Sequence, residues 1–170
     1  MLYSQYLPRI ITIVFFVLLF SCGTDKDNVL GLAENELAYI LANGTSRTYS
    51  ASCTLTNEND EYKLTFRASE ASDGIIITLK NVKPFESTNY TFFKDVSIII
   101  NDKTDGELYV YVTTGCKDIQ GAFEILNWDK KNKTITGKFS GPICTRGIFA
   151  HIPSTHIDEA AFYKIKYNER

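Results

Sequence analysis

The chain has 170 residues, of which 44% are hydrophobic, and its formal net charge at pH 7 is −2. This length allows one domain with a sizeable buried core. The longest run of adjacent cations is the pair Lys130-Lys131. A protein that binds the phosphates of a nucleic acid needs a much larger basic surface, so we expect no nucleic-acid partner.

The beginning of the chain has the pattern of a secretory signal peptide. Arg9 precedes a mainly apolar run, residues 10–20, which is too short for a membrane-spanning helix of about 20 residues. The run ends in Leu19-Phe20-Ser21-Cys22, where a branched apolar residue lies three positions before the cysteine and a small residue directly before it. This is the pattern of a bacterial lipobox. It predicts a lipoprotein signal peptide over residues 1–21 and lipid on Cys22; the alternative is an ordinary signal peptide followed by a chance cysteine.

A lipidated Cys22 predicts a location in the bacterial cell envelope, as an outer membrane lipoprotein whose partner is the membrane itself, reached through acyl chains such as palmitate. Residues 22–36 are mostly small, charged or turn-forming, and we expect them to form a lipidated tether. Residues 37–170 are expected to form a single β domain. Residues 29–42 fit either one face of a helix or a strand, and we favour the strand.

From Tyr49 onward, apolar residues alternate with polar ones, and turn-forming clusters recur at short intervals. β-branched and aromatic residues fill the alternating runs, and no segment has a sustained helical stripe. The pattern predicts an all-β fold, an antiparallel meander of about ten strands. A β-sandwich and a flattened barrel both need one apolar face per strand, so alternation leaves both forms open.

Two hairpins are predicted in detail. In the first, a turn at residues 57–61 places Cys53 opposite Phe66. In the second, over residues 121–141, we expect Ile125 to lie opposite Ile135 and Gly121 opposite Phe139. Near the end of the chain, Ser154-Thr155 followed by Asp158-Glu159 has the pattern of a helix N-cap with acids in the first turn, which is compatible with a short C-terminal helix.

The chain has four cysteines, and Cys22 is assigned to the lipid. Three remain for an oxidising compartment, so one disulfide and one free thiol are the simplest account. The register predicted for the second hairpin places Cys116 opposite Cys144, and we expect these two to form the disulfide. Cys53 alternates with apolar residues and is expected to stay reduced as a small core residue.

No catalytic or metal site is expected from the sequence. There is no G-x-S-x-G motif, and the two histidines, His151 and His156, are five residues apart. This spacing fits neither a helix nor a strand that would aim both imidazoles, with Asp158 or Glu159, at one metal ion. Residues 101–106 resemble a calcium loop, but Lys103 occupies a ligand position, so a turn is the better interpretation. We expect no cofactor and no enzymatic activity.

Aromatic residues make up 13% of the chain, and they are the one compositional hint of binding. Tyr109 and Tyr111 share one face of a predicted strand and are our speculative ligand-binding residues. Stacking on a sugar or peptide suits such a face. Packing between two sheets suits it equally, and we favour the packing alternative.

Several motifs together resemble a known family. They are Ala42-Asn43-Gly44, Asn127-Trp128-Asp129, the I-T-G-K-F-S run over residues 135–140, and Gly147-Ile148-Phe149. These residues resemble the small β-rich lipoproteins of unknown function that are common in Bacteroidota, over about residues 37–153. The resemblance implies an exported, lipid-anchored β domain and brings no activity with it. Asp25 and Asp27 also resemble the acidic export tag of surface-displayed lipoproteins in these bacteria.

Three functional hypotheses follow. The first is a lipid-anchored, non-enzymatic binding or accessory module whose partner is a glycan, a peptide or an envelope protein. The second is a structural or interaction subunit of an envelope complex, and the third is a hydrolase. A concave aromatic-lined cavity would favour the first hypothesis, a broad apolar patch the second, and convergent titratable side chains with perturbed pKa values the third.

Overall fold

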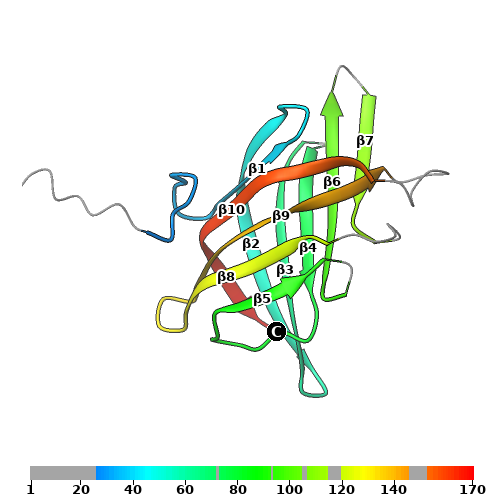
Figure 1. Ribbon diagram of the computed structural model, residues 1–170. Helices are drawn as coiled ribbons and strands as arrows, with labels where there is room; N and C mark the ends of the chain where they lie inside the picture. Colours follow the sequence, from blue (N-terminus) through cyan, green and yellow to red (C-terminus); the bar gives the residue numbers. More distant parts are fainter. Residues whose placement is uncertain (1–25, 72, 93, 105–106, 115–119, 146–152) are drawn as a thin grey trace, which may run out of the picture.

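The computed structural model describes residues 26–71, 73–92, 94–104, 107–114, 120–145 and 153–170 (Figure 1). Within these residues the chain forms ten strands and no helix. The strands are β1 (Glu36–Leu41), β2 (Ser46–Glu58), β3 (Glu61–Glu70), β4 (Asp73–Leu79), β5 (Thr88–Thr91), β6 (Val96–Thr104), β7 (Glu107–Val112), β8 (Ala122–Asp129), β9 (Thr134–Thr145) and β10 (Pro153–Glu169). The predicted all-β class is confirmed, and so is the strand in the ambiguous segment before residue 42.

The ten strands belong to one sheet that closes into a ring. Neighbouring strands are hydrogen-bonded in the order β1-β10-β2-β3-β4-β6-β7-β9-β8-β5. A further pairing of β9 with β10 closes the strands from β10 to β9 in this order into a ring. Figure 1 shows β5, β8, β9 and β10 crossing in front of β2, β3, β4 and β6. The predicted sequential antiparallel meander holds for β1-β2-β3-β4, for β6-β7 and for β8-β9-β10. Elsewhere β4 pairs with β6, β7 pairs with β9, and β10 pairs with β2 in parallel. The ring is consistent with a flattened barrel or a sandwich.

A continuous hydrophobic core fills the interior of the ring. Four phenylalanines from four strands meet there. The ring of Phe162 lies 4.7 Å from that of Phe66 and 5.3 Å from that of Phe123, which in turn lies 5.5 Å from Phe139. Burying one such side chain contributes roughly 1.5 to 3 kcal/mol, so this cluster holds the two layers together.

The β2–β3 hairpin has the predicted pairing, with Cys53 opposite Phe66. Its turn is shorter than predicted, because the strands extend to Glu58 and Glu61. Asn59 and Asp60 alone form the turn, with φ angles of 55° and 65°. Two residues with positive φ give the turn whose twist matches that of the flanking strands, and asparagine and aspartate tolerate this conformation well.

The β8–β9 hairpin has a different register from the predicted one. Ile125 lies opposite Gly137 instead of Ile135, Phe123 lies opposite Phe139, and a bulge follows Ile125. Gly137 accounts for the shift, because a Cβ atom there would come within 2.3 Å of the Glu124 carbonyl oxygen on β8 and within 2.4 Å of the Phe162 ring. This position has room only for glycine, because the backbone of β8 and the Phe162 ring of β10 both approach it closely.

The predicted short helix near the end of the chain is wrong. His156, Asp158 and Glu159 lie within β10, which continues from Pro153 to Glu169. β10 is hydrogen-bonded to β1 along one edge and to β9 along the other. The hydrogen bonds along both edges of β10 satisfy many more backbone groups than an N-cap would, so the strand forms in place of the helix.

The N-terminal segment that is described, residues 26–35, attaches to the outer face of β1 and β10. Leu30 and Leu32 pack against Ala38, Ala161 and Tyr163. The side chain of Asn28 accepts a hydrogen bond from the Leu32 amide (2.7 Å) and donates one to the Leu32 carbonyl (2.8 Å). This end of the expected tether therefore contacts the domain. The predicted signal peptide and Cys22 lie outside the described residues, and in the described part no helix is long and apolar enough to cross a membrane.

Candidate binding sites at the two ends of the ring

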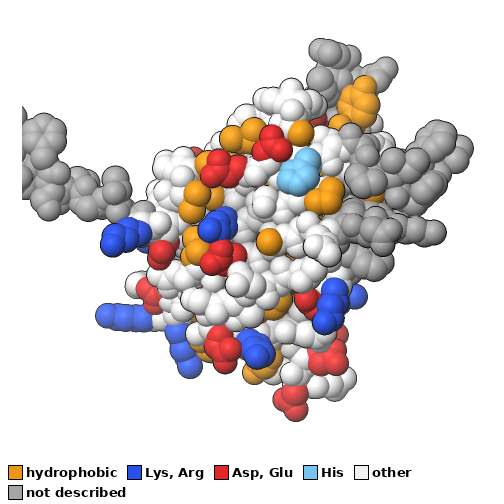
Figure 2. Space-filling model, in the orientation of Figure 1, with side chains coloured by type: hydrophobic (Ala, Val, Ile, Leu, Met, Phe, Trp, Pro, Cys, Tyr) orange, Lys and Arg blue, Asp and Glu red, His pale blue; other side chains and the backbone are white. Residues whose placement is uncertain are grey.

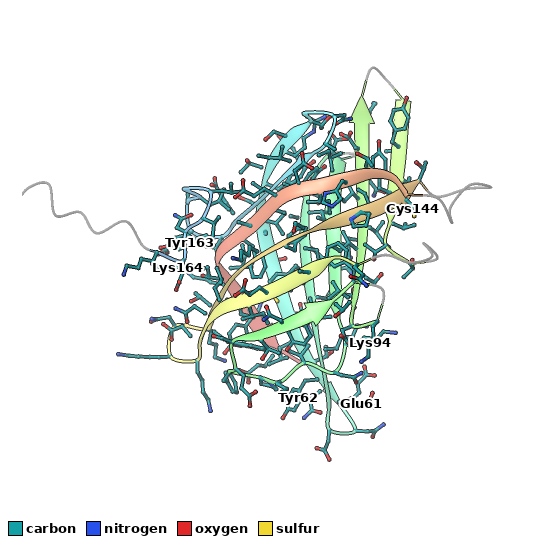
Figure 3. All side chains as sticks on the ribbon, in the orientation of Figure 1. Glu61, Tyr62, Lys94, Cys144, Tyr163 and Lys164 are labelled. Atoms are coloured by element: carbon teal, nitrogen blue, oxygen red, sulfur yellow. The ribbon has the colours of Figure 1, made fainter. Side chains whose placement is uncertain are left out.

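Aromatic side chains gather at the end of the ring that holds the β2–β3 turn, which is the lower end in Figure 1. We call it the aromatic end, comprising Leu55, Tyr62, Phe85, Trp128 and Tyr167. Figure 3 shows Tyr62 at this end. The segment between β4 and β5 is anchored here. The Val82 amide donates to the Tyr62 carbonyl (3.0 Å), and the Ser87 hydroxyl donates to the Leu126 carbonyl (2.9 Å).

An open cavity of about 480 Å³ lies at the aromatic end. Its lining comes from β2, β3, the β4–β5 segment, the β8–β9 turn and the end of β10: Leu55, Asn57, Tyr62, Phe85, Lys130, Glu169 and Arg170. The volume falls in the usual range for small-molecule pockets, roughly 300 to 1,000 Å³. An apolar wall with polar groups of both charge signs on its rim is typical of a ligand site.

Phe85 forms part of this wall in a strained backbone conformation. Its φ angle is +67°, and its side chain is 41% exposed. A bulky residue with positive φ is held at a cost of about 1 to 3 kcal/mol. Its ring packs 5.4 Å from the Trp128 ring, and Lys130 Nζ lies 4.7 Å from its centre. These two contacts hold Phe85 over Trp128.

Two hydrogen-bond donors are buried behind Phe85. The rings of Trp128 and Tyr167 meet edge to face at 6.0 Å. Trp128 Nε1 and the Tyr167 hydroxyl are both buried and have no hydrogen-bond partner. Leaving such a group unpaired costs about 1 to 3 kcal/mol, so each orphaned donor calls for an explanation.

The opposite end of the ring is polar; we call it the polar end, comprising Tyr39, Arg47, Tyr49, Asp73 and Asp102. Arg47 Nη2 lies 2.9 Å from Asp102 Oδ1, and Arg47 Nε lies 3.9 Å from Asp73 Oδ2. The Asp102 side chain is only 2% exposed, whereas Arg47 is 31% exposed. Desolvation is the largest single cause and lowers the pKa of Arg47, but the charge of Asp102, its hydrogen bond to Arg47 and the two neighbouring tyrosines together outweigh it, so that pKa lies above its ordinary value. Asp102 is therefore a buried charge held by a partner.

Two tyrosines lie beside this ion pair. The rings of Tyr39 and Tyr49 are 6.2 Å apart. Both hydroxyls are buried with no hydrogen bond of standard geometry, and a longer contact between them affects the pKa of each. Burial is the main cause that raises the pKa of each phenol above its ordinary value. Both hydroxyls therefore stay protonated throughout the physiological pH range.

Tyr109 and Tyr111, the predicted ligand-binding residues, lie near the polar end and away from the cavity. Tyr109 is opposite Asp102 in the β6–β7 ladder, and the two tyrosine rings are stacked 6.4 Å apart. Tyr111 packs partly against the core, as the packing alternative expects, and burial followed by the charge of Asp102 raises its pKa. Tyr109 is 39% exposed.

The cysteine predictions have different outcomes. Cys53 is a free, buried thiol, as predicted, and burial raises its pKa. Cys144 is buried in β9 opposite Val112 of β7, so the register argument that placed it opposite Cys116 is wrong. Cys116 itself lies outside the described residues, and the Cys116–Cys144 disulfide stays a prediction.

The histidine prediction concerns one described residue. His156 is exposed, and its Nδ1 lies 3.4 Å from Asp158 Oδ1; His151 lies outside the described residues. Among the residues that are described, no group of three or more His, Cys, Asp or Glu side chains is arranged to hold a metal ion.

The sequence did not single out Phe85, Lys130 or the other residues of the cavity. They come from five separate parts of the chain, and no local spacing connects them.

No family model, no curated protein and no solved structure matches this chain.

Proposed function

We propose that this protein is a lipid-anchored, non-enzymatic binding module of the bacterial cell envelope. The observation that carries the proposal is the aromatic-end cavity. It combines an apolar wall formed by Leu55 and Phe85 with a rim that includes Asn57 and Lys130. Such a combination binds a ligand by burying its apolar surface and orients it through a few polar contacts.

Anchoring through Cys22 is the second part of the proposal. The Asn28 side chain is hydrogen-bonded to the Leu32 backbone on the surface of the domain. Only a few residues separate Asn28 from Cys22. An extended chain spans about 3.3 to 3.6 Å per residue, so the domain would be held within roughly 20 Å of the membrane. Two or three acyl chains anchor a protein far more firmly than one. Asp25 and Asp27 support display on the cell surface.

The chemistry of the polar end supports a non-enzymatic protein. Its charged side chains, Arg47, Asp73 and Asp102, are engaged with one another. Carboxylates serve as nucleophile or base in some hydrolases, but here Asp102 is buried, and both Asp73 and Asp102 face the Arg47 guanidinium.

The surface gives less support to an interaction subunit of an envelope complex. The exposed large hydrophobic residues among those described are Val29, Phe85, Leu108 and Tyr109. They come from three separate parts of the chain. On the face seen in Figure 2, charged side chains of both signs are interspersed, and hydrophobic side chains form small groups.

Localisation and binding each have a direct test. Cys22→Ser should move the protein from the membrane fraction to the soluble fraction, and protease added to whole cells should digest the wild-type domain. Trp128 is the single tryptophan of the chain, so its emission reports on the aromatic end alone. The full chain, extracted in a detergent without a sugar headgroup, should show a saturable change in this emission with a member of a saccharide or peptide library.

Two results would contradict the proposal. If Cys22→Ser remained in the membrane fraction, the lipid anchor would be wrong. If no saccharide or peptide changed the emission of Trp128, the binding module would be wrong.

A further inference from the structure

We propose that the ligand of the aromatic-end cavity is a saccharide, an inference that rests on the proposed binding function and makes it more specific. A sugar ring has an apolar face of C–H groups and an edge of hydroxyl groups. The cavity has the matching arrangement, because the rings of Tyr62 and Phe85 lie beside polar side chains. An aromatic ring can bury the apolar face of a sugar while polar side chains beside it reach the sugar's hydroxyl groups.

The charges on the rim favour a neutral ligand. Lys130 and Arg170 offer donors, Glu169 offers acceptors, and the amide of Asn57 offers both. An anionic ligand would meet Glu169, and a cationic one would meet Lys130 and Arg170. Hydroxyl groups both donate and accept, so a neutral polyol can bond to every one of these side chains.

The strands around the cavity disfavour an extended peptide. A peptide that binds by adding a strand needs an unpaired sheet edge for its main chain. Here Leu55 is paired with Leu64 of β3 and with Glu169 of β10, and Asn57 is paired with Tyr62. The Leu55 carbonyl also accepts a hydrogen bond from the Arg170 amide (3.0 Å). Recognition at this cavity therefore depends on side chains.

Phe85 gives the cavity a wall that can move. It is exposed, its positive φ is strained, and it covers Trp128, whose Nε1 has no hydrogen-bond partner. A ligand that displaces the Phe85 ring would also change the surroundings of Trp128, whose ring lies 5.4 Å behind it. Strained backbone clusters at ligand sites, and a buried donor without a hydrogen-bond partner calls for an explanation; both features occur together here.

A glycan array followed by titration tests the inference. The full chain, in a detergent without a sugar headgroup, is applied to the array, and each bound saccharide is titrated while Trp128 emission is recorded. We expect a saturable change with at least one saccharide. Phe85→Leu keeps an apolar side chain but removes the aromatic face, and should weaken binding about tenfold. Lys130→Gln is a second variant at an exposed position and should also weaken binding.

Tyr109→Leu is the matched control, because Tyr109 and Phe85 are similarly exposed, at 39% and 41%, on different ends of the ring. Binding should be unchanged in this variant. Weaker binding with Tyr109→Leu, together with unchanged binding in Phe85→Leu and Lys130→Gln, would overturn the site. A peptide that changes Trp128 emission when no saccharide does would overturn the ligand class and leave the binding module intact. If neither class binds, the inference and the proposed function both fail.

Discussion

The two ends of the ring are covered in different ways. At the polar end, Asp102 is buried and held by Arg47 at 2.9 Å. At the aromatic end, Phe85 rests on Trp128 through ring contacts and keeps a strained φ of +67°. Breaking a buried ion pair exposes an uncompensated charge, whereas separating two rings loses only contact area and relieves strain. The polar end is therefore suited to holding the fold, and the aromatic end is suited to rearranging around a ligand.

The largest effect is expected from the predicted disulfide between Cys116 and Cys144, a covalent link that neither end of the ring contains; Cys144 lies opposite Val112 of β7. Cys116→Ser should lower the free energy of unfolding by about 3 to 4 kcal/mol, because the bond constrains the unfolded chain. Non-reducing peptide mapping should identify a linked Cys116–Cys144 peptide. Cys53→Ala is the control and should leave this linkage in place. A linked peptide that contains Cys53 would refute the assignment.

The ion pair of the polar end gives the next effect. Arg47→Met leaves Asp102 buried without the guanidinium, and should lower the free energy of unfolding by about 2 to 3 kcal/mol; Arg47 is partly exposed, so the loss is less than for a fully buried pair. Urea titration measures it. Adding Asp102→Asn removes the buried charge and should recover part of the loss. No recovery in the double variant would mean that Arg47 acts through packing.

The polar end should also weaken at alkaline pH. The ordinary tyrosine pKa is 10.0, and the pKa of Tyr39 is raised in the folded protein. Below pH 10 the phenol is protonated in both the folded and the unfolded state. As the pH rises above 10, the unfolded state loses the proton and the folded state keeps it, so the free energy of unfolding falls by up to about 1.4 kcal/mol per pH unit. Urea titrations between pH 9 and 11 measure the fall, and Tyr39→Phe should reduce it.

Two tyrosine variants, measured at neutral pH, test the difference between the ends further. The Tyr90 hydroxyl accepts a hydrogen bond from the Lys83 amide (3.2 Å), next to the segment that carries Phe85. Tyr90→Phe should lower the free energy of unfolding by about 1 kcal/mol. The Tyr39 hydroxyl has no hydrogen bond of standard geometry, so Tyr39→Phe should leave stability unchanged or raise it slightly. Equal losses in the two variants would contradict this difference.

The smallest change in stability is expected for Phe85→Gly. Glycine tolerates the positive φ, so relief of strain should nearly offset the lost contact with Trp128. The emission of Trp128 should shift to the red, and acrylamide should quench it more strongly, because its cover is gone. Tyr109→Gly, on the other end, should leave the emission as it is. An unchanged spectrum in Phe85→Gly would mean that Phe85 does not shield Trp128.

The candidate sites show why function was harder to predict than fold. Tyr109 and Tyr111 stood out because they alternate along one strand, and the structure places them near the polar end. The cavity was missed because Leu55, Phe85 and Lys130 belong to distant segments. The side chains that enclose a cavity become neighbours only when the ring closes.

The sequence by itself determined the all-β class, the strand before residue 42, the pairing of Cys53 with Phe66, and the free Cys53 thiol. These depend on the two-residue period of a strand and on a short turn, which are local properties. Only the tertiary structure decided the β8–β9 register, the extended β10 and the aromatic-end cavity. Gly137 must fit under Phe162, β10 gains hydrogen bonds from two partner strands, and the cavity needs five segments to meet. Each of these depends on contacts between residues far apart in the chain, and such contacts override local preference.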